Sequence, residues 1–350
     1  MPEIGPADLL LEVVLCGVDG SELAMFSGHH EYLNARVPVI FGDEIVGRVV
    51  AVGASAAERR GLVLGDRVVV EARWPCEEGC HTCQQGQYYL CERRGLQNGY
   101  GTLSAGNPPH LWGGYASHVF VPPEALVYRV PDVLSDRTAL IACSPLANGL
   151  RWVREAGVRK ATHVVVIGPG PQGLSCALAA VALGRCVTLV GLETDVERLR
   201  TAETMGAATY VTSRTDTPDL LQHAADEIVA AHGPVDAVIE VSGSPGGKDL
   251  AMCVVRALGT IVSVASPNPS VRPFDWRTLM WKEITVKGRI SHPNTVSEAF
   301  GLARRLAAEG IDVGEWVTHV FPLDKVPEAI RTAAYKSAAR PIKVALDPMA

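Results

Sequence analysis

Four cysteines with metal-ligand spacing are the most informative group of reactive side chains in this sequence. Cys76, Cys80, Cys83 and Cys91 follow the pattern C-x3-C-x2-C-x7-C. Four thiolates can close a tetrahedral zinc shell without an open position, which is the arrangement of a structural rather than a catalytic zinc. Two disulfides or reduced core cysteines are the alternatives, but the segments between the cysteines are polar and turn-forming, which favours zinc.

A second chemical signal is a glycine-rich turn between a predicted apolar strand, 162–167, and a predicted apolar helix, 174–183. Its glycines allow a tight turn and a close approach of the backbone to a pyrophosphate, while the helix N-terminus offers free N–H groups. An ordinary βα turn is the alternative, but strand, turn, helix and second strand follow in order, which favours a Rossmann nucleotide site. The predicted contacts are Gly168, Gly170, Pro171, Gln172 and Gly173.

The residue that ends the second strand of this unit predicts the choice of nucleotide. Glu193 lies 20 residues past Gly173, where a carboxylate would accept hydrogen bonds from the ribose hydroxyls and repel a 2′-phosphate. NAD is therefore favoured over NADP. Arg198 and Arg200 follow on the next helix and could reach a phosphate, so Arg198 is also a candidate cofactor contact. Val264, the last residue of a later predicted strand, completes the cofactor-binding set.

The elements around these motifs predict two domains. Short β-rich runs with glycine and proline punctuation extend to about residue 147, whereas strands and amphipathic helices alternate after it. The last stretch, from about residue 291, is too short for a domain and should fold back onto the first half. We therefore expect an α/β chain with a β-rich domain (1–147 and 291–350) and a doubly wound parallel sheet (148–290). The expected strands are 9–15, 45–52, 67–70, 115–121, 162–167, 186–190, 237–241, 260–264 and 342–346, the expected helices are 174–183, 196–205 and 296–308, and 321–323 is an expected turn.

Composition excludes several classes of partner. The 350 residues are 47% hydrophobic and carry a net charge of -6 without a cluster of Lys and Arg, so neither nucleic acid nor an anionic membrane is an expected partner. The apolar start 9–15 is too short to span a bilayer, and acidic residues precede it, unlike a signal peptide. Nine cysteines, four of them at metal spacing, fit the reducing cytoplasm.

The order of these parts resembles the medium-chain, zinc-type alcohol dehydrogenase superfamily over essentially the whole chain. The resemblance rests on segments 16–22, 41–47, 65–68, 113–116 and 318–323, together with the four-cysteine segment and the glycine-rich turn. It implies a GroES-like catalytic domain, a Rossmann domain, a nicotinamide cofactor and a small-molecule substrate. It also implies a homodimer or homotetramer in which the strand near 281–288 pairs across a two-fold axis.

The sequence departs from this family at the catalytic metal. The three family positions that hold the zinc read Asp19, Asp43 and Ser144 here. Cys16 matches a cysteine that is often a non-ligand, and Cys143 reads as a small buried residue. Zinc could still be held by Asp19, Asp43 and the adjacent Glu44, although an all-oxygen shell suits magnesium or manganese better. We favour a site without a metal.

In a site without a metal, the family geometry implies that Asp19 and Asp43 lie side by side, facing the nicotinamide. Two carboxylates in contact cannot both ionise easily, so the pair could hold a proton near neutral pH and act as a general acid or base. Glu44 resembles the glutamate behind the family's metal, and Lys343 sits where a cation often faces it. Ser21 matches the hydroxyl that bonds the substrate oxygen. For Glu44 and Lys343, the alternative is an ion pair with a purely structural role. For Ser21, the alternative is an exposed residue that caps a helix.

These assignments predict an NAD(H)-dependent oxidoreductase that transfers a hydride between nicotinamide and a secondary alcohol or ketone of a small polar or natural-product substrate. A zinc-independent reductase of a C=C or C=N bond is the alternative, and an inactive nucleotide-binding protein is a third possibility. His110 and Trp112 are candidate wall residues of the substrate cleft, although a packed loop is the simpler interpretation. His29 and His30 are expected in a solvated loop.

Overall fold

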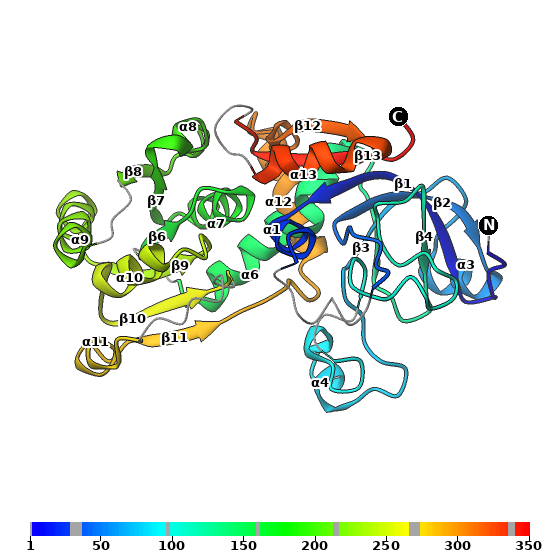
Figure 1. Ribbon diagram of the computed structural model, residues 1–350, viewed down its shortest axis with the longest axis horizontal. Coiled ribbons are helices and arrows are strands. Elements are labelled where there is room, and N and C mark those ends of the chain that lie inside the picture. The colour runs from blue at the N-terminus through cyan, green and yellow to red at the C-terminus, as the bar shows by residue number, and fades with distance from the viewer. Residues whose placement is uncertain are drawn as a thin grey trace. The chain divides into compact units, whose positions relative to one another are not determined.

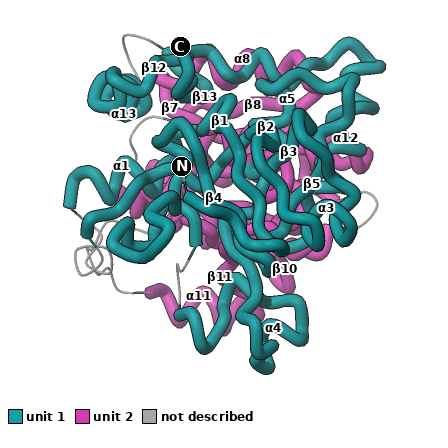
Figure 2. Tube along the Cα trace, turned by 90° about the vertical axis from the view of Figure 1, so that its right-hand side faces the viewer, with its two compact units in different colours: residues 1–144, 293–350 teal, residues 145–292 magenta. Residues whose placement is uncertain are grey.

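The computed structural model describes residues 2–28, 37–95, 99–158, 162–212, 217–265, 274–334 and 340–350. The chain divides into two compact units, drawn in different colours in Figure 2. Unit 1 comprises residues 1–144 and 293–350, and unit 2 comprises residues 145–292. The boundaries expected from the sequence differ from these by two or three residues.

A seven-stranded, mainly antiparallel sheet forms the centre of unit 1 (Figure 1). The strand order is β12-β13-β1-β2-β3-β5, and β4 pairs with β1. Alternate residues of β1, namely Leu9, Leu11 and Val13, face one core because successive side chains of a strand point to opposite faces. The elements are β1 (Leu9–Val18), α1 (Gly20–Phe26), β2 (Ile45–Val52), α3 (Ala54–Arg60), β3 (Arg67–Val70), α4 (His81–Gln84), η1 (Tyr88–Leu90), β4 (His118–Val121), β5 (Val127–Arg129), α5 (Asp136–Ile141) and η2 (Ala142–Leu146), the last of which runs into unit 2.

The C-terminal stretch completes this sheet. It contributes α12 (Val296–Ala308), η4 (Val313–Trp316), β12 (Val317–Pro322), η5 (Leu323–Lys325), α13 (Val326–Ala334) and β13 (Lys343–Asp347). β13 pairs antiparallel with β1, and β12 pairs parallel with β13. The turn expected at 321–323 is wrong, because Phe321 and Pro322 still pair with Leu346 and Asp347.

A six-stranded parallel sheet forms the centre of unit 2. Its order, β11-β10-β9-β6-β7-β8, is that of a Rossmann fold, in which the chain direction across the sheet reverses beside the first strand, β6. β6 is fully buried and valine-rich, as expected for a parallel strand covered on both faces. The elements are α6 (Ala147–Glu155), β6 (His163–Ile167), α7 (Pro171–Ala182), β7 (Cys186–Leu192), η3 (Glu193–Asp195), α8 (Val196–Thr204), β8 (Ala208–Thr212), α9 (Pro218–His232), β9 (Val235–Glu240), α10 (Pro245–Val254), β10 (Val255–Ser263), α11 (Trp276–Trp281) and β11 (Thr285–Gly288).

Helices α9 and α10 pack on the face of this sheet that carries Val165 and Ile167, whereas α7 packs against both α6 and α8. The predicted α/β fold class, with a β-rich domain and a doubly wound parallel sheet, is therefore confirmed. None of the described helices has the length and apolar character needed to cross a membrane.

Candidate functional site

The four cysteines of unit 1 converge around α4 and η1. All four sulfur atoms lie within 4.8 Å of one another, with 3.9 Å between the Sγ atoms of Cys76 and Cys83 and 3.7 Å between those of Cys80 and Cys91. A zinc–sulfur distance of about 2.3 Å gives tetrahedral sulfur–sulfur edges of about 3.8 Å. The four thiols are free of disulfides and fit a closed zinc shell.

Hydrogen-bond donors around Cys76, Cys80 and Cys91 favour the thiolate form that zinc requires, whereas burial raises the pKa of Cys83. The backbone N–H of Cys80 donates to Cys76 Sγ at 3.3 Å, and that of Arg94 donates to Cys91 Sγ at 3.4 Å. The hydroxyl of Thr82, followed by backbone N–H groups, lowers the pKa of Cys80 to about 5. Among the described residues, this is the one group of three or more His, Cys, Asp or Glu with a metal-binding arrangement.

A buried carboxylate ties the cysteine lobe to the rest of unit 1. Glu71 follows β3, and its side chain accepts hydrogen bonds from the hydroxyl of Tyr88 in the lobe and, at 2.6 Å, from that of Tyr128. The backbone N–H of Asn294 donates to the same carboxylate at 3.0 Å. Burial raises the pKa of Glu71 despite these donors. The lobe is therefore positioned by a polar network rather than by apolar packing alone.

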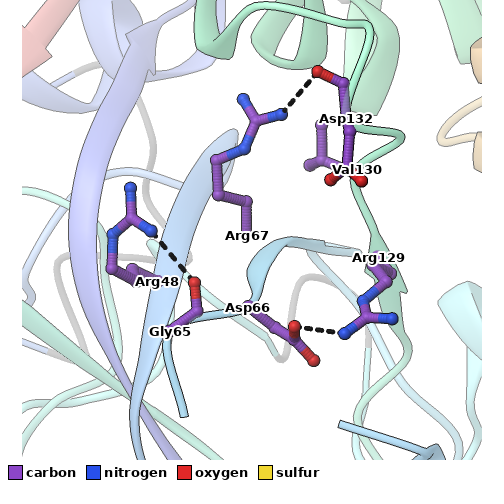
Figure 3. A pocket seen from close by; sticks show the side chains of 7 residues that line it. All are labelled: Arg48, Gly65, Asp66, Arg67, Arg129, Val130 and Asp132. Atoms are coloured by element: carbon purple, nitrogen blue, oxygen red, sulfur yellow. Dashed lines mark hydrogen bonds and ion pairs between the residues drawn. The ribbon is translucent and has the colours of Figure 1, made fainter. Parts of the chain in front are cut away.

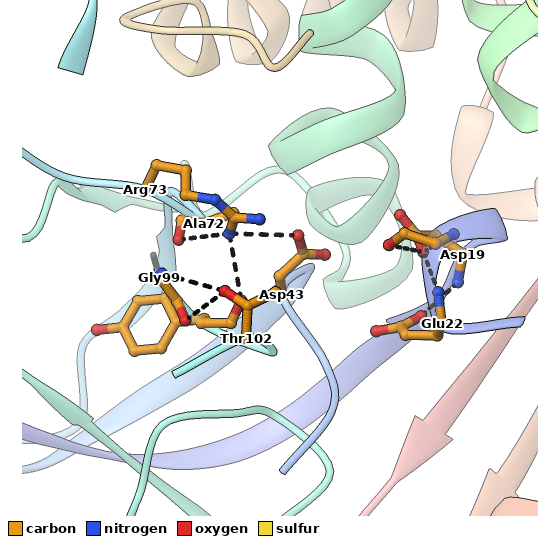
Figure 4. A network of polar contacts seen from close by, with 9 residues as sticks. Asp19, Glu22, Asp43, Ala72, Arg73, Gly99 and Thr102 are labelled. Carbon is orange, nitrogen blue, oxygen red and sulfur yellow. Dashed lines mark hydrogen bonds and ion pairs between the residues drawn. The ribbon is translucent and has the colours of Figure 1, made fainter. Parts of the chain in front are cut away.

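Asp19 begins helix α1 as its N-cap. Its Oδ1 accepts hydrogen bonds from the Ser21 backbone N–H and hydroxyl, both at 2.7 Å, and from the Glu22 N–H at 3.1 Å. Glu22 Oε2 in turn accepts from the Asp19 N–H at 2.6 Å, which completes a capping box. Figure 4 shows Asp19 and Glu22 bound to each other in this way. The predicted substrate hydroxyl, Ser21, is thus exposed and already donates to Asp19.

Asp43 lies beside Arg73, a residue to which the sequence reasoning gave no role. Asp43 Oδ2 is 3.8 Å from Arg73 Nη1, and this nitrogen also donates to the backbone carbonyls of Ala72 at 3.0 Å and Tyr100 at 3.2 Å (Figure 4). Burial, followed by repulsion from the Asp19 charge, raises the pKa of Asp43 to about 7, although Arg73 opposes the rise. A carboxyl with this pKa can give or take a proton near neutral pH.

Glu44 pairs with Lys343 in the interior of unit 1. The two side chains are 1% and 2% exposed, and the Lys343 ammonium also donates to the Val18 carbonyl at 3.0 Å. Burial would lower the pKa of Lys343, but the charges of Glu44 and Asp19 outweigh it and raise this pKa to about 12. Burial raises the pKa of Glu44, and the charge of Lys343 opposes this rise. The pair is therefore buried away from solvent.

The structure thus gives each predicted carboxylate its own partner. Asp19 caps a helix, Asp43 faces Arg73, and Glu44 faces Lys343. Asp19 and Asp43 are close enough for repulsion to affect the pKa of Asp43, whereas their sharing of one proton stays a prediction. Cys16 and Cys143 are fully buried, and the Cys143 thiol donates to the Leu140 carbonyl at 3.1 Å.

The glycine-rich turn of unit 2 has the predicted shape. Gly168 has a φ of +106°, and a side chain on it would meet the backbone of Ser242 at 2.9 Å, so only glycine fits there. A Cβ on Gly173 would meet the Gly168 carbonyl at 1.8 Å, which explains the close contact between strand and helix. A Cβ on Gly170, the N-cap of α7, would meet nothing within 4 Å. Open space at a helix N-terminus suits a phosphate group.

The remaining predicted cofactor residues lie near the carboxyl ends of β7 and β10. Glu193 is exposed directly after β7. Arg198 is largely buried, and its guanidinium lies 3.5 Å from Asp195, while Arg200 is exposed and bonds Glu197 instead. The backbone N–H of Val264 donates to the backbone carbonyl of Glu240 in β9 at 3.2 Å. Glu193 is therefore the exposed charge at the predicted ribose position.

The two candidate wall residues have structural roles in unit 1. Trp112 is 8% exposed and packs in the core, with its ring centroid 6.2 Å from that of Trp74 and 5.4 Å from that of Phe120. His110 is bonded through Nδ1 to the Ala105 carbonyl at 2.7 Å. Trp112 therefore has the role expected in the alternative interpretation, that of a residue in a packed loop. His29 and His30 lie outside the described residues.

A surface pocket of about 330 Å³ lies elsewhere in unit 1 (Figure 3). Three arginines line it, but Arg129 pairs with Asp66, Arg67 donates to the Asp132 carbonyl at 3.4 Å, and Arg48 donates to the Gly65 carbonyl at 3.0 Å. The pocket contains none of the predicted site residues, so we do not place the reaction there.

Comparisons with known proteins agree with the two-part architecture. The alcohol dehydrogenase GroES-like domain model matches residues 5–132, and the zinc-binding dehydrogenase model matches residues 171–305. A Mycobacterium tuberculosis protein named "probable alcohol dehydrogenase" is 33% identical over 308 residues, which cover 85% of this chain and 80% of the relative.

Two further relatives cover nearly the whole chain. The erythritol/L-threitol dehydrogenase of Mycolicibacterium smegmatis is 30% identical over 358 residues, which cover 99% of this chain and 92% of the relative. A solved Sinorhizobium meliloti structure bound to NADP has a TM-score of 0.80 and 26% identity, and the match covers 99% of this chain and 94% of that one.

Proposed function

The chain belongs to the medium-chain, zinc-type alcohol dehydrogenase superfamily, and from this premise we propose that it is an NAD(H)-dependent oxidoreductase without a catalytic zinc. It transfers a hydride between nicotinamide and a secondary alcohol or ketone carbon of a small polar, polyol-like or natural-product substrate. The names of the relatives support this substrate class, since one acts on erythritol and L-threitol. The observation that carries the proposal is the glycine-rich turn at the first strand of a parallel sheet, with the exposed Glu193 after the second.

The preference for NAD rests on the exposed carboxylate of Glu193, which would accept the ribose hydroxyls and repel a 2′-phosphate. Arg198 supports the same choice, because its guanidinium is already paired with Asp195. The Sinorhizobium meliloti relative binds NADP, so the preference proposed here is a property of this chain's own residues.

Bound NAD supplies the hydride acceptor at C4 of the nicotinamide. The protein must then accept the proton that the substrate hydroxyl loses as its C–H hydride leaves. Asp43 is suited to this role, because its pKa of about 7 lets the carboxylate take the proton in one direction and return it in the other. Asp19 tunes Asp43 through its charge. The Ser21 hydroxyl would donate a hydrogen bond to the substrate oxygen only by turning away from Asp19, to which it donates in the structure.

The two metal positions differ in how well they fit zinc. The four cysteines fit a structural ion by distance and by their N–H donors. The acidic residues do not fit a catalytic ion, because the cations Arg73 and Lys343 already face Asp43 and Glu44. A divalent ion placed there would be repelled by both cations and would lack the imidazole and thiolate ligands that zinc prefers.

The second candidate function is a reductase of an activated C=C or C=N bond. This reaction needs no Lewis acid, so it is also compatible with a site that has no catalytic zinc. In that reaction, protonated Asp43 would donate its proton as NADH delivers a hydride to the other atom of the bond. An inactive nucleotide-binding protein is the third candidate, and it predicts binding of NADH with no turnover.

We further propose that the chain acts as a homodimer or homotetramer. β11 is an edge strand, and Val286 on it and Trp281 before it are 40% and 76% exposed. The unpaired N–H and C=O groups of an exposed sheet edge can pair with the same edge of another chain. The free cysteines fit a reducing compartment such as the cytoplasm.

Turnover assays test the main proposal. Secondary alcohols and polyols with NAD⁺, and ketones, enones and imines with NADH, would be followed through NADH absorbance. Asp43→Asn should lower turnover by about 10²- to 10⁴-fold with unchanged NADH affinity. Asp324→Asn, at an exposed position of unit 1, is the matched control and should retain turnover. Near-normal turnover of Asp43→Asn with an unchanged pH profile would show that this carboxyl carries no proton in the reaction.

A further inference from the structure

Arg73 occupies a fixed position beside the candidate proton carrier. It lies three residues after the end of β3, and its Nη1 donates to the backbone carbonyls of Ala72 and Tyr100 at 3.0 and 3.2 Å. Both acceptors are main-chain atoms, so the location of the guanidinium is set by the fold and does not depend on the Asp43 side chain.

We propose that Arg73 is a positioning residue of the reaction, which holds one oxygen of the Asp43 carboxylate and turns the other toward the substrate proton. The distance of 3.8 Å from Arg73 Nη1 to Asp43 Oδ2 supports an ion pair. Figure 4 shows one oxygen of Asp43 directed at Arg73 and the other on the side of Asp19. This inference rests on the proposed role of Asp43 in proton transfer.

The ion pair of Arg73 and Asp43 is more exposed to solvent than the neighbouring pair of Glu44 and Lys343. Glu44 and Lys343 are only 1% and 2% exposed, as expected for a pair that supports the fold. Arg73 and Asp43 are 15% and 20% exposed, so a small molecule can reach Asp43 while the pair is still partly desolvated. Asp43 and Glu44 therefore have different roles. Arg73, the cation beside the accessible Asp43, affects the reaction.

The charged groups around Asp43 give the direction of the effect. Asp19 and Glu44 raise its pKa, whereas Arg73 and, to a smaller extent, Lys343 lower it, and the acidic groups Glu22 and Cys16 also interact with it. Arg73 is the largest of the influences that lower the pKa. Loss of its charge should therefore make Asp43 retain its proton to a higher pH, by about one unit or more.

The test is the pH dependence of kcat/KM for alcohol oxidation, in which the carboxylate must be ionised. The acid limb of the wild-type profile should have its midpoint near pH 7, the pKa of Asp43. Arg73→Gln should move this midpoint upward by about one unit, which is about a 10-fold loss on the acid limb, with an unchanged KM for NAD⁺. Arg73→Lys keeps the charge and should move it far less. Arg129→Gln removes an arginine from a surface pair and should leave the profile unchanged.

Two parallel measurements keep the outcomes separate. Carbon NMR of labelled aspartate carboxyl groups, with the Asp43 signal identified from Asp43→Asn, reads the same pKa without turnover. Arg73→Met serves as a second neutral variant if Arg73→Gln does not fold. An unchanged Asp43 pKa and profile in either folded neutral variant overturns the role of Arg73, whereas retained turnover in Asp43→Asn overturns the proposed proton transfer instead.

Discussion

Asp43→Asn should stabilise the protein while it impairs the reaction. Burial and the charge of Asp19 raise the pKa of Asp43 from 3.8 to about 7, so the ionised side chain is held at a cost in the folded state. A shift of this size corresponds to about 4 kcal/mol at a pH where Asp43 is ionised. Because one fifth of the side chain remains exposed, solvent screening reduces this value, and we expect a gain of about 2 to 4 kcal/mol.

The gain should depend on pH in a defined direction. A carboxyl whose folded pKa is raised binds a proton more tightly in the folded state, so its stabilising contribution is complete below the unfolded value of 3.8 and is lost as the pH rises to about 7. Asparagine has no such titration. The free energy of unfolding of the variant should therefore match that of the wild type near pH 4 and exceed it above pH 7.

Urea denaturation at several pH values, followed by tryptophan fluorescence, measures this difference. Trp74 and Trp112 are buried in unit 1 and report the unit that contains Asp43. At the same pH values, the turnover of Asp43→Asn should be lower than that of the wild type. Gains in stability at a functional site commonly lower activity in this way. A difference in unfolding free energy that stays constant between about pH 4 and pH 8 would refute the perturbed pKa of Asp43, and with it the reasoning on proton transfer.

The other predictions concern the metal, the cofactor and the assembly. Metal analysis should find one zinc per chain, and Cys83→Ser should lose it and lower the Tm, whereas two zinc ions per chain would place a metal at the acidic residues. NADH should bind more tightly than NADPH in fluorescence titrations, and Glu193→Ala should narrow the difference; tighter NADPH binding in the wild type would make Arg198 the governing residue. Light scattering should find a dimer or tetramer that Val286→Lys weakens, and a wild-type monomer at micromolar concentration would contradict the proposed interface.

Local patterns predicted much of the fold. β2, β3 and α12 have the expected bounds, because glycine and proline punctuation limits the strands and a 3.6-residue apolar period defines the helix. β4 begins at His118 and not at the expected Tyr115, since the Tyr115 N–H bonds the Phe41 carbonyl in a loop. From the sequence, helix α1 was implied only by the helix-cap alternative for Ser21. The cap is in fact Asp19, and Glu22 three residues later completes a capping box that could have predicted the start of the helix.

The candidate site was predictable only where spacing or resemblance encodes it. The cysteine lobe follows from the separation of its ligands along the chain, and Lys343 follows from the resemblance. The role of Arg73 depends on a tertiary contact with Asp43, thirty positions earlier, and nothing in the local sequence marks that contact. The caps and ion pairs around the carboxylates depend in the same way on the folded backbone.

The carboxylate of Glu71 has a consequence for how the protein is made. Its donors come from the cysteine lobe, from β5 and, last, from Asn294 in the returning C-terminal stretch. On the ribosome, all four cysteines emerge long before Asn294 exists. The four thiols of the nascent lobe are therefore without this clamp until residue 294 has been synthesised, so the proposed zinc would bind, or the thiols would need protection, before the lobe is docked.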